Sequence, residues 1–498
     1  MSEARITFTP DFVVGPVRRR TFGSFVEHLG RCVYEGIYEP GHPTADAKGF
    51  RGDVIELVRE LGVSTVRYPG GNFVSGYRWE DGVGPRDQRP RRLDLAWHST
   101  DPNWVGLDDF MDWAHKADIE PMMAVNLGTR GVAEALDILE YANIPGGTTL
   151  SDQRRANGAE EPHRITLWCL GNEMDGPWQT AARTAHEYGR IASQTAKAMR
   201  MVNPDLELVA CGSSNSGMPT FGTWEREVLQ ECFDDVDMIS AHSYYWVKDG
   251  DLQGFLLSAV DMDRFIASIA ATADAVAAAR KSTKRIGISF DEWNVWYSDG
   301  EASQTPTGDD WPVAPHLLED NYTVADAVVV GNLLISLLRN TDRVWVANQA
   351  QLVNVIAPIM TEVGGPAWKQ TIFHPFALTA RHAQGEVLRV NLDAPIIDSP
   401  QFGEAPAIDA VATHDVASGE TAVFLVNRSA TETITVRATV PGARLVEAVT
   451  FHNEDNQYKA SAGDHDSVVP QPNASASLTD DELSLDLPPV SWSMVRLG

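Results

Sequence analysis

The stretch DVIELVRELGVSTVRYPGG, residues 53–71, begins with a helical pattern and sets the interpretation of the rest of the chain. Apolar residues at helical spacing fall on one face of it, namely Val54, Leu57, Val58 and Leu61. Asp53 is placed to cap the first turn, and Gly62 is placed to end the helix because glycine adopts the left-handed conformation without strain. The spacing therefore predicts an amphipathic helix at the start of this stretch.

The second half of the same stretch has the pattern of a buried strand. Residues 64–68 are rich in β-branched side chains, and the run breaks at Pro69-Gly70-Gly71, which is typical of a tight turn. A helix that leads directly into a strand and a turn is one repeat of an alternating α/β fold.

The same alternation recurs from about residue 21 to residue 376. Strands are predicted at residues 22–26, 65–68, 121–126, 165–170, 206–210, 238–241, 285–290 and 343–347. Helical patterns lie between most of them, for example at 182–201 and 263–280. These units predict an α/β fold, a (β/α)8 TIM barrel over residues 21–376. A doubly wound sheet is the rival, and it is disfavoured because no glycine-rich phosphate loop follows the first strand.

Beyond about residue 379 the hydrophobic period changes to two. Ile434, Val436, Ala438 and Val440 alternate with polar residues, and so do Leu483, Leu485 and Leu487. This pattern predicts an all-β domain over residues 377–498. Residues 468–477 are rich in Pro, Ser, Ala and Asn and are predicted to form a loop.

Composition narrows the class of partner. The chain has 498 residues, of which 43% are hydrophobic and 22% charged, as in a globular protein. Asp and Glu number 69 against 40 Lys and Arg, so the formal net charge is −29. That field repels nucleic acids and anionic membranes, and it is compatible with an uncharged substrate.

The N-terminal segment and the cysteines point to the cytoplasm. The first twenty residues show no basic segment followed by an apolar run, so no secretory signal is visible. The most apolar later stretch, 327–338, is too short to span a bilayer and is predicted to be a buried helix. The four cysteines are scattered without a CxxC pair, which favours reduced thiols.

Two glutamates stand where a barrel places catalytic groups, just past the C-terminal ends of strands. Asn172 and Glu173 follow a buried strand in RITLWCLGNEMDGPWQ, and Asp291 and Glu292 follow another in RIGISFDEWNVWY. An apolar wall beside Glu173 favours its neutral, proton-donating form. Two carboxylates on separate strand ends with aromatic neighbours predict glycoside cleavage.

Other strand ends add polar groups that suit a ligand with many hydroxyls. They are Glu27, Arg67, Asn72, Asn126, His242, Tyr244 and Gln351. Any one of them taken alone is more often structural, whereas their concentration at one end of a barrel favours a binding site.

At these residues the chain resembles glycoside hydrolase family 51, the α-L-arabinofuranosidases. The motifs GNEMDGPWQ, FDEWNVWY, RYPGGNF and AQLVNVIAPIMTE carry the resemblance, which covers nearly the whole chain. It implies a barrel with a jelly-roll-like sandwich that includes residues 1–20 as an N-terminal strand. It also implies an exo-acting, retaining enzyme that releases arabinofuranosyl residues from oligosaccharides. Because members are commonly hexamers, it implies a homo-oligomer.

The resemblance also implies roles for particular residues. Glu173 corresponds to the acid/base and Glu292 to the nucleophile. The residues that would hydrogen-bond the arabinofuranosyl ring are Glu27, Asn72, Asn172, Tyr244 and Gln351. Arg67 and His242 would flank the nucleophile, and Trp97 and Trp296 would shape the leaving-group side.

No metal or other cofactor is predicted, because the chain has neither HExxH nor a His-x-His on a barrel strand. Three alternatives remain open from the residues alone. They are another retaining glycosidase of the same barrel clan (a β-xylosidase or an endoglucanase), a metal-dependent barrel lyase or aldolase, and a carbohydrate-binding protein that has lost catalysis.

Overall fold

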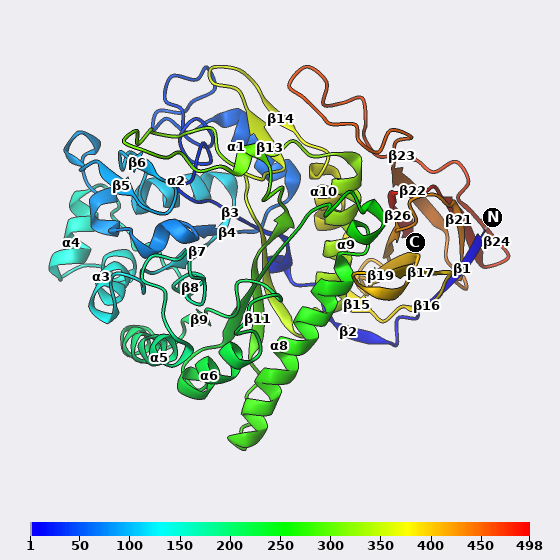
Figure 1. The fold of residues 1–498 in the computed structure, drawn as a ribbon, viewed down its shortest axis with the longest axis horizontal. Coiled ribbons are helices and arrows are strands. Elements are labelled where there is room, and N and C mark those ends of the chain that lie inside the picture. Colours follow the sequence, from blue (N-terminus) through cyan, green and yellow to red (C-terminus); the bar gives the residue numbers. More distant parts are fainter. Residues whose placement is uncertain (1) are drawn as a thin grey trace.

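A computed structural model describes residues 2–498 and contains a closed barrel of eight parallel strands (Figure 1). The barrel strands are β3 (Gly23–Phe25), β4 (Thr65–Tyr68), β7 (Glu120–Ala124), β8 (Leu167–Leu170), β9 (Glu207–Ala210), β10 (Met238–Tyr245), β11 (Gly287–Val295) and β12 (Val344–Gln349). The barrel closes where β12 pairs with β3. Each predicted strand overlaps one of these, so the TIM barrel is confirmed and the doubly wound sheet is wrong.

Helices surround the barrel strands. They are α1 (Gly52–Leu61), α2 (Leu107–Ala117), α3 (Val132–Asn143), α4 (Thr149–Ala156), α5 (Ala185–Val202), α6 (Thr223–Cys232), α7 (Leu252–Phe255), α8 (Ala259–Ala279), α9 (Val324–Arg339) and α10 (Phe373–His382). Helices α5 and α8 lie where the helical patterns predicted them. Nowhere in residues 2–498 is a helix both long and apolar enough to cross a membrane.

Helix α1 shows how well its local pattern worked. The predicted face is buried at Val54, Val58 and Leu61, and Gly62 ends the helix at a φ of 81°. The predicted cap is wrong: the helix begins at Gly52, and Asp53 lies inside the first turn. The Asp53 carboxylate instead pairs with the buried guanidinium of Arg51, with 2.6 Å between Oδ2 and Nη2.

Helix α9 is the apolar stretch near residues 327–338, and the prediction of a buried helix is confirmed. It lies between the barrel and the C-terminal sheets, and it contacts α8 and α10 on one side and β19, β20 and β26 on the other (Figure 1). Gly331 permits the close approach of this helix, because a Cβ there would lie 2.3 Å from Cδ1 of Trp492. This packing joins the two parts of the molecule.

The C-terminal part is all-β, as its period-two pattern predicted. One sheet has the order β16 (Asn391–Asp393), β1 (Ser2–Thr7), β21 (Ile434–Thr439), β25 (Glu482–Leu487) and β24 (Ser477–Thr479). The other has the order β2 (Val13–Pro16), β15 (Glu386–Leu388), β19 (Ile408–His414), β20 (Thr421–Asn427), β26 (Ser491–Leu497), β22 (Leu445–Phe451) and β23 (Gln471–Pro472). Strand β23 and the first residue of β24, Ser477, lie inside the predicted loop 468–477, so that prediction is wrong at three residues.

Three hairpins lie outside these sheets. They are β5–β6 (Arg92–Asp94, Ser99–Asp101), β13–β14 (Ile359–Thr361, Ala367–Lys369) and β17–β18 (Ile396–Ser399, Gly403–Pro406).

Strand β1, near the start of the chain, pairs with two strands of the C-terminal part. Strand β1 runs parallel to β21 and antiparallel to β16, and it lies at the far right of the molecule beside the C-terminal sheet (Figure 1). The domain limits stay predictions: residue 1 of the segment 1–20 lies outside the described residues, and the limit between 376 and 377 falls within α10.

Candidate active site

Glu173 and Glu292 lie at the same end of the barrel and line one cavity of about 460 Å³. Glu173 follows β8 as predicted, whereas β11 continues past Glu292 to Val295, so this glutamate lies within the strand and not after it. A carboxylate oxygen of each lies within 4.8 Å of the other. This upper limit is compatible with the roughly 5 to 5.5 Å between the carboxyl groups of retaining glycosidases, and it disfavours the roughly 6.5 to 9.5 Å of inverting ones.

Glu292 is surrounded by donors. Arg67 Nη1 donates to Oε1 at 2.7 Å, and the Tyr244 hydroxyl donates to Oε2 at 2.8 Å. Burial acts to lower the pKa of Arg67, but Asp291 and Glu292 raise it well above its ordinary value. The guanidinium is therefore a permanent cation beside Glu292.

The turn after β4 brings the backbone close to the same carboxylate. A Cβ at position 71 would lie 3.0 Å from Glu292 Oε1, so any larger residue here would press against this carboxylate. Gly71, the last residue of the predicted tight turn, also lines the cavity.

Glu173 is held by two N–H groups. Trp178 Nε1 donates to Oε2 at 2.7 Å, and His242 Nδ1 lies 2.9 Å from Oε1. The apolar wall expected around Glu173 is therefore supplemented by polar partners. Its backbone has a φ of 43°, a left-handed conformation that is uncommon for a residue with a Cβ and that clusters at functional sites.

His242 connects the two glutamates with Asp291. Its Nε2 lies 2.9 Å from Asp291 Oδ1, and its Nδ1 lies 3.5 Å from Glu292 Oε2. Burial acts to lower the pKa of His242, but Glu292, Asp291 and Glu173 together raise it to about 10. Burial likewise acts to raise the pKa of Asp291, but Arg67 and His242 hold it below its ordinary value. His242 consequently holds a proton at neutral pH.

Most of the predicted site residues line the cavity, namely Glu27, Asn72, Trp97, Glu173, Tyr244, Glu292, Trp296 and Gln351. Arg67, Asn172 and His242 lie behind its wall and are nearly inaccessible. Asn172 accepts from Arg67 Nη2 at 2.7 Å and donates to Asn72 at 3.2 Å, so in this structure it positions neighbours. Its predicted contact with the sugar stays a prediction.

Glu27 is the most buried carboxyl that faces the cavity. Its Oε1 accepts from Trp97 Nε1 and from the Phe73 backbone N–H, each at 2.9 Å. Gln351 Nε2 donates to its Oε2 at 3.2 Å. Burial raises the pKa of Glu27 to about 7, although these hydrogen bonds oppose the rise.

Comparisons with known proteins identify the chain. Residues 57–264 match the α-L-arabinofuranosidase 1 domain, and residues 291–491 match the α-L-arabinofuranosidase C-terminal domain. An intracellular exo-α-(1→5)-L-arabinofuranosidase from Streptomyces lividans is 56% identical over all of this chain and 75% of its own length. The chain belongs to glycoside hydrolase family 51.

Further relatives are matched over nearly all of their own length. An exo-α-(1→6)-L-arabinofuranosidase from Bifidobacterium longum is 55% identical over all of this chain and 98% of its own. The structure of a family 51 α-L-arabinofuranosidase from Bifidobacterium longum superposes with a TM-score of 0.96 at 49% identity, and both chains are covered completely. The structure of an arabinose complex of the Thermotoga maritima α-L-arabinofuranosidase superposes with a TM-score of 0.88 at 32% identity, and the match covers 100% of this chain and 99% of that one.

The family resemblance left some cavity residues unassigned. Trp178 lies within the motif GNEMDGPWQ and could have been found from it. Ser298, Ser303 and Thr305 come from the loop 298–312, whose contacts were not predicted, and they line the cavity. Asp291 is adjacent to Glu292 in the sequence, but only its contact with His242 shows its importance.

A metal ion is disfavoured by the charges around the family 51 site. Glu173, His242 and Glu292 each offer one ligand atom within 4.8 Å of the others. Arg67 lies 2.7 Å from Glu292, however, and its positive charge opposes a second cation there. The predicted absence of a metal stays a prediction.

Proposed function

We propose that the protein is an exo-acting α-L-arabinofuranosidase that removes terminal arabinofuranosyl residues from arabinose-containing oligosaccharides with retention. The observation that carries this proposal is the pair Glu173 and Glu292, within 4.8 Å of each other in one cavity. The relatives named exo-α-L-arabinofuranosidases support the substrate class. They also disfavour a β-xylosidase or an endoglucanase.

In the proposed first step, Glu292 attacks the anomeric carbon as the glycosidic C–O bond breaks. Glu173 delivers a proton to the leaving oxygen, so the alcohol departs neutral and the sugar remains as an ester of Glu292. In the second step Glu173 removes a proton from water, which attacks the ester and releases arabinose. The enzyme then regains its starting protonation state.

The neighbours of each glutamate support these opposite roles. Arg67 and Tyr244 donate to Glu292 and fix the orientation of the nucleophile. His242 Nε2 is oriented toward Asp291, so its Nδ1 faces Glu173 Oε1 at 2.9 Å. A proton held between these two atoms is positioned to leave through Glu173, and His242 would return to the neutral form while the leaving group departs.

The proposed cellular location follows from the names of the relatives. We propose a cytoplasmic location, because the relatives from Streptomyces lividans and Bacillus subtilis are named intracellular. A substrate there would be an oligosaccharide. A homo-oligomer, of which a hexamer is one form, is part of the same proposal and rests on the resemblance alone.

The test is a comparison of leaving groups. Glu292→Ala is expected to abolish turnover of every substrate, because no covalent ester can form. Glu173→Ala is expected to lose about 100-fold to 10,000-fold in kcat/KM on unactivated arabino-oligosaccharides. It should lose far less on an activated aryl arabinofuranoside, whose departure needs little protonation.

The control is Glu56→Ala, an exposed glutamate on α1, which should behave as wild type on both substrates. Equal losses of the Glu173 variant on activated and unactivated substrates would show that Glu173 is not the acid. A first-formed arabinose of inverted anomeric configuration, observed by NMR, would exclude double displacement.

A further inference from the structure

A second cavity of about 320 Å³ adjoins the active-site cavity on the side of Trp296. The residues that line both are Ser214, Asn215, Tyr244, Trp296 and Ser298. Tyr244 and Trp296 form the shared wall, with their rings edge to face and 5.3 Å between centroids. We call this second cavity the outer pocket. A ligand that fills the active-site cavity can extend past this wall into it.

One side of the outer pocket comes from the C-terminal part of the chain. Gln401 and Phe402 lie at the turn of hairpin β17–β18 and line the pocket. Phe402 is buried with Leu257 and Ala405, and its backbone oxygen accepts from Arg264 Nη2 at 2.8 Å. The hairpin is thereby anchored to α8. Because the pocket is already formed without a ligand, binding does not carry the entropy cost of ordering this segment.

Hydrogen bonds within the outer pocket also fix its polar side chains. Asp261 accepts from the Ser216 hydroxyl at 3.0 Å and from the Tyr245 hydroxyl at 3.1 Å. Both donors are neutral, and they hold the Asp261 carboxylate at the base of α8.

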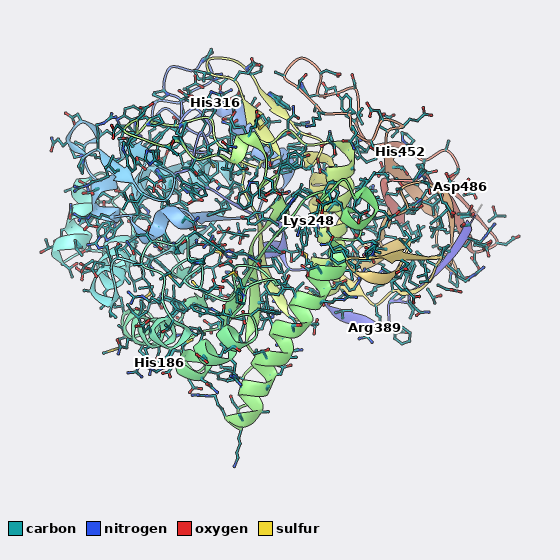
Figure 2. The ribbon with its side chains drawn as sticks, in the orientation of Figure 1. His186, Lys248, His316, Arg389, His452 and Asp486 are labelled. Carbon is teal, nitrogen blue, oxygen red and sulfur yellow. The ribbon has the colours of Figure 1, made fainter. Side chains whose placement is uncertain are left out.

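The lining suits a neutral sugar. Trp246 contributes an aromatic ring, and Lys248 Nζ lies 4.5 Å from the centroid of that ring. Figure 2 shows Lys248 between the barrel and the C-terminal sheets in this view. Within residues 2–498 the lining contains one basic side chain, Lys248, and one acidic side chain, Asp261, so its charges balance. An aromatic face with hydroxyl and amide groups around it matches the C–H faces and hydroxyls of a sugar ring.

We propose that the outer pocket binds the second sugar unit on the leaving-group side, so that neutral trisaccharides and longer chains are better substrates than disaccharides. This inference rests on the proposed function, because it takes the active-site cavity to hold the unit that is cleaved. The resemblance to the family implies that Trp296 shapes the leaving-group side, and this residue lines both the active-site cavity and the outer pocket.

The experiment uses three substrates with the same terminal arabinofuranosyl unit: an aryl arabinofuranoside, a disaccharide and a linear trisaccharide of the same linkage. The wild-type enzyme is expected to cleave the trisaccharide with a higher kcat/KM than the disaccharide. Trp246→Ala should lose about fivefold to tenfold on the trisaccharide, as expected for one aromatic contact. It should lose less than about twofold on the other two substrates.

Two further variants keep the test specific. Val247→Ala changes the neighbouring exposed side chain, which does not line the pocket, and should behave as wild type. Gln401→Ala changes an exposed residue on the hairpin and should reduce only the trisaccharide rate.

Each outcome decides between the two proposals. Equal losses of Trp246→Ala on all three substrates, or no loss on any, would overturn the outer pocket as a sugar site. A wild-type enzyme that cleaves the aryl substrate without preferring the trisaccharide would overturn this inference and leave the proposed function standing. A wild-type enzyme that cleaves none of the three would overturn the proposed function itself.

Discussion

Replacing Glu27 with glutamine is expected to remove a pH-dependent loss of stability from the wild-type protein. The Glu27 side chain is 2% exposed, and burial raises its pKa from 4.5 to about 7. Glutamine has nearly the same shape, keeps an acceptor for Trp97 and Phe73, and cannot ionise. The variant therefore isolates the ionisation of one carboxyl.

The direction follows from the two pKa values of Glu27. Because the folded-state pKa is the higher one, the folded protein holds this proton more tightly than the unfolded chain does. The stability that the proton contributes is complete below pH 4.5 and is lost as the pH rises through about 7. The two values differ by about 2.5, and at about 1.4 kcal/mol per pKa unit the loss is about 3 to 4 kcal/mol.

The assay measures the free energy of unfolding of both proteins by urea titration, in steps from about pH 4 to about pH 8. The wild-type value minus the Glu27→Gln value should fall by about 3 to 4 kcal/mol across this range. Glu56→Gln, at an exposed position on α1, should give a difference that does not depend on pH. A constant difference for Glu27→Gln would refute the reasoning, since burial would then not disfavour the ionised carboxyl.

Two further predictions concern the active site and the contact between the barrel and the C-terminal sheets. Arg67→Lys keeps the charge beside Glu292 but loses the planar guanidinium that donates to both Glu292 and Asn172, so kcat/KM should fall by about tenfold or more. Full activity would show that this double contact is unimportant. Gly331→Ala places a Cβ 2.3 Å from Trp492 and should lower the free energy of unfolding by about 1 to 3 kcal/mol. Gly41→Ala, whose Cβ would have open space around it, should leave the free energy of unfolding unchanged. Equal stability of the two variants in a urea titration would contradict the packing argument.

Local pattern was sufficient to predict the elements of the barrel and of the β domain. The apolar face of α1 and the alternation in β21 depend on residues a few positions apart, so the sequence records them directly. The cap at Asp53 failed for the opposite reason. The neighbouring Arg51 is buried by hydrogen bonds to the backbone oxygens of Glu362 and Gly365, far along the chain. The Asp53 carboxylate pairs with this buried guanidinium and therefore does not cap the helix.

The amino-acid order alone determined that Glu173 and Glu292 would meet, because the carboxyl ends of all strands in a parallel barrel share one face. Only the tertiary structure decided which atoms meet there. His242 bridges Glu173 and Asp291 because a register shift in the β10–β11 pairing sets it opposite Glu292. The outer pocket likewise exists only where hairpin β17–β18 packs on α8. Such contacts join distant residues, and they depend on how the whole molecule packs and not on any local period.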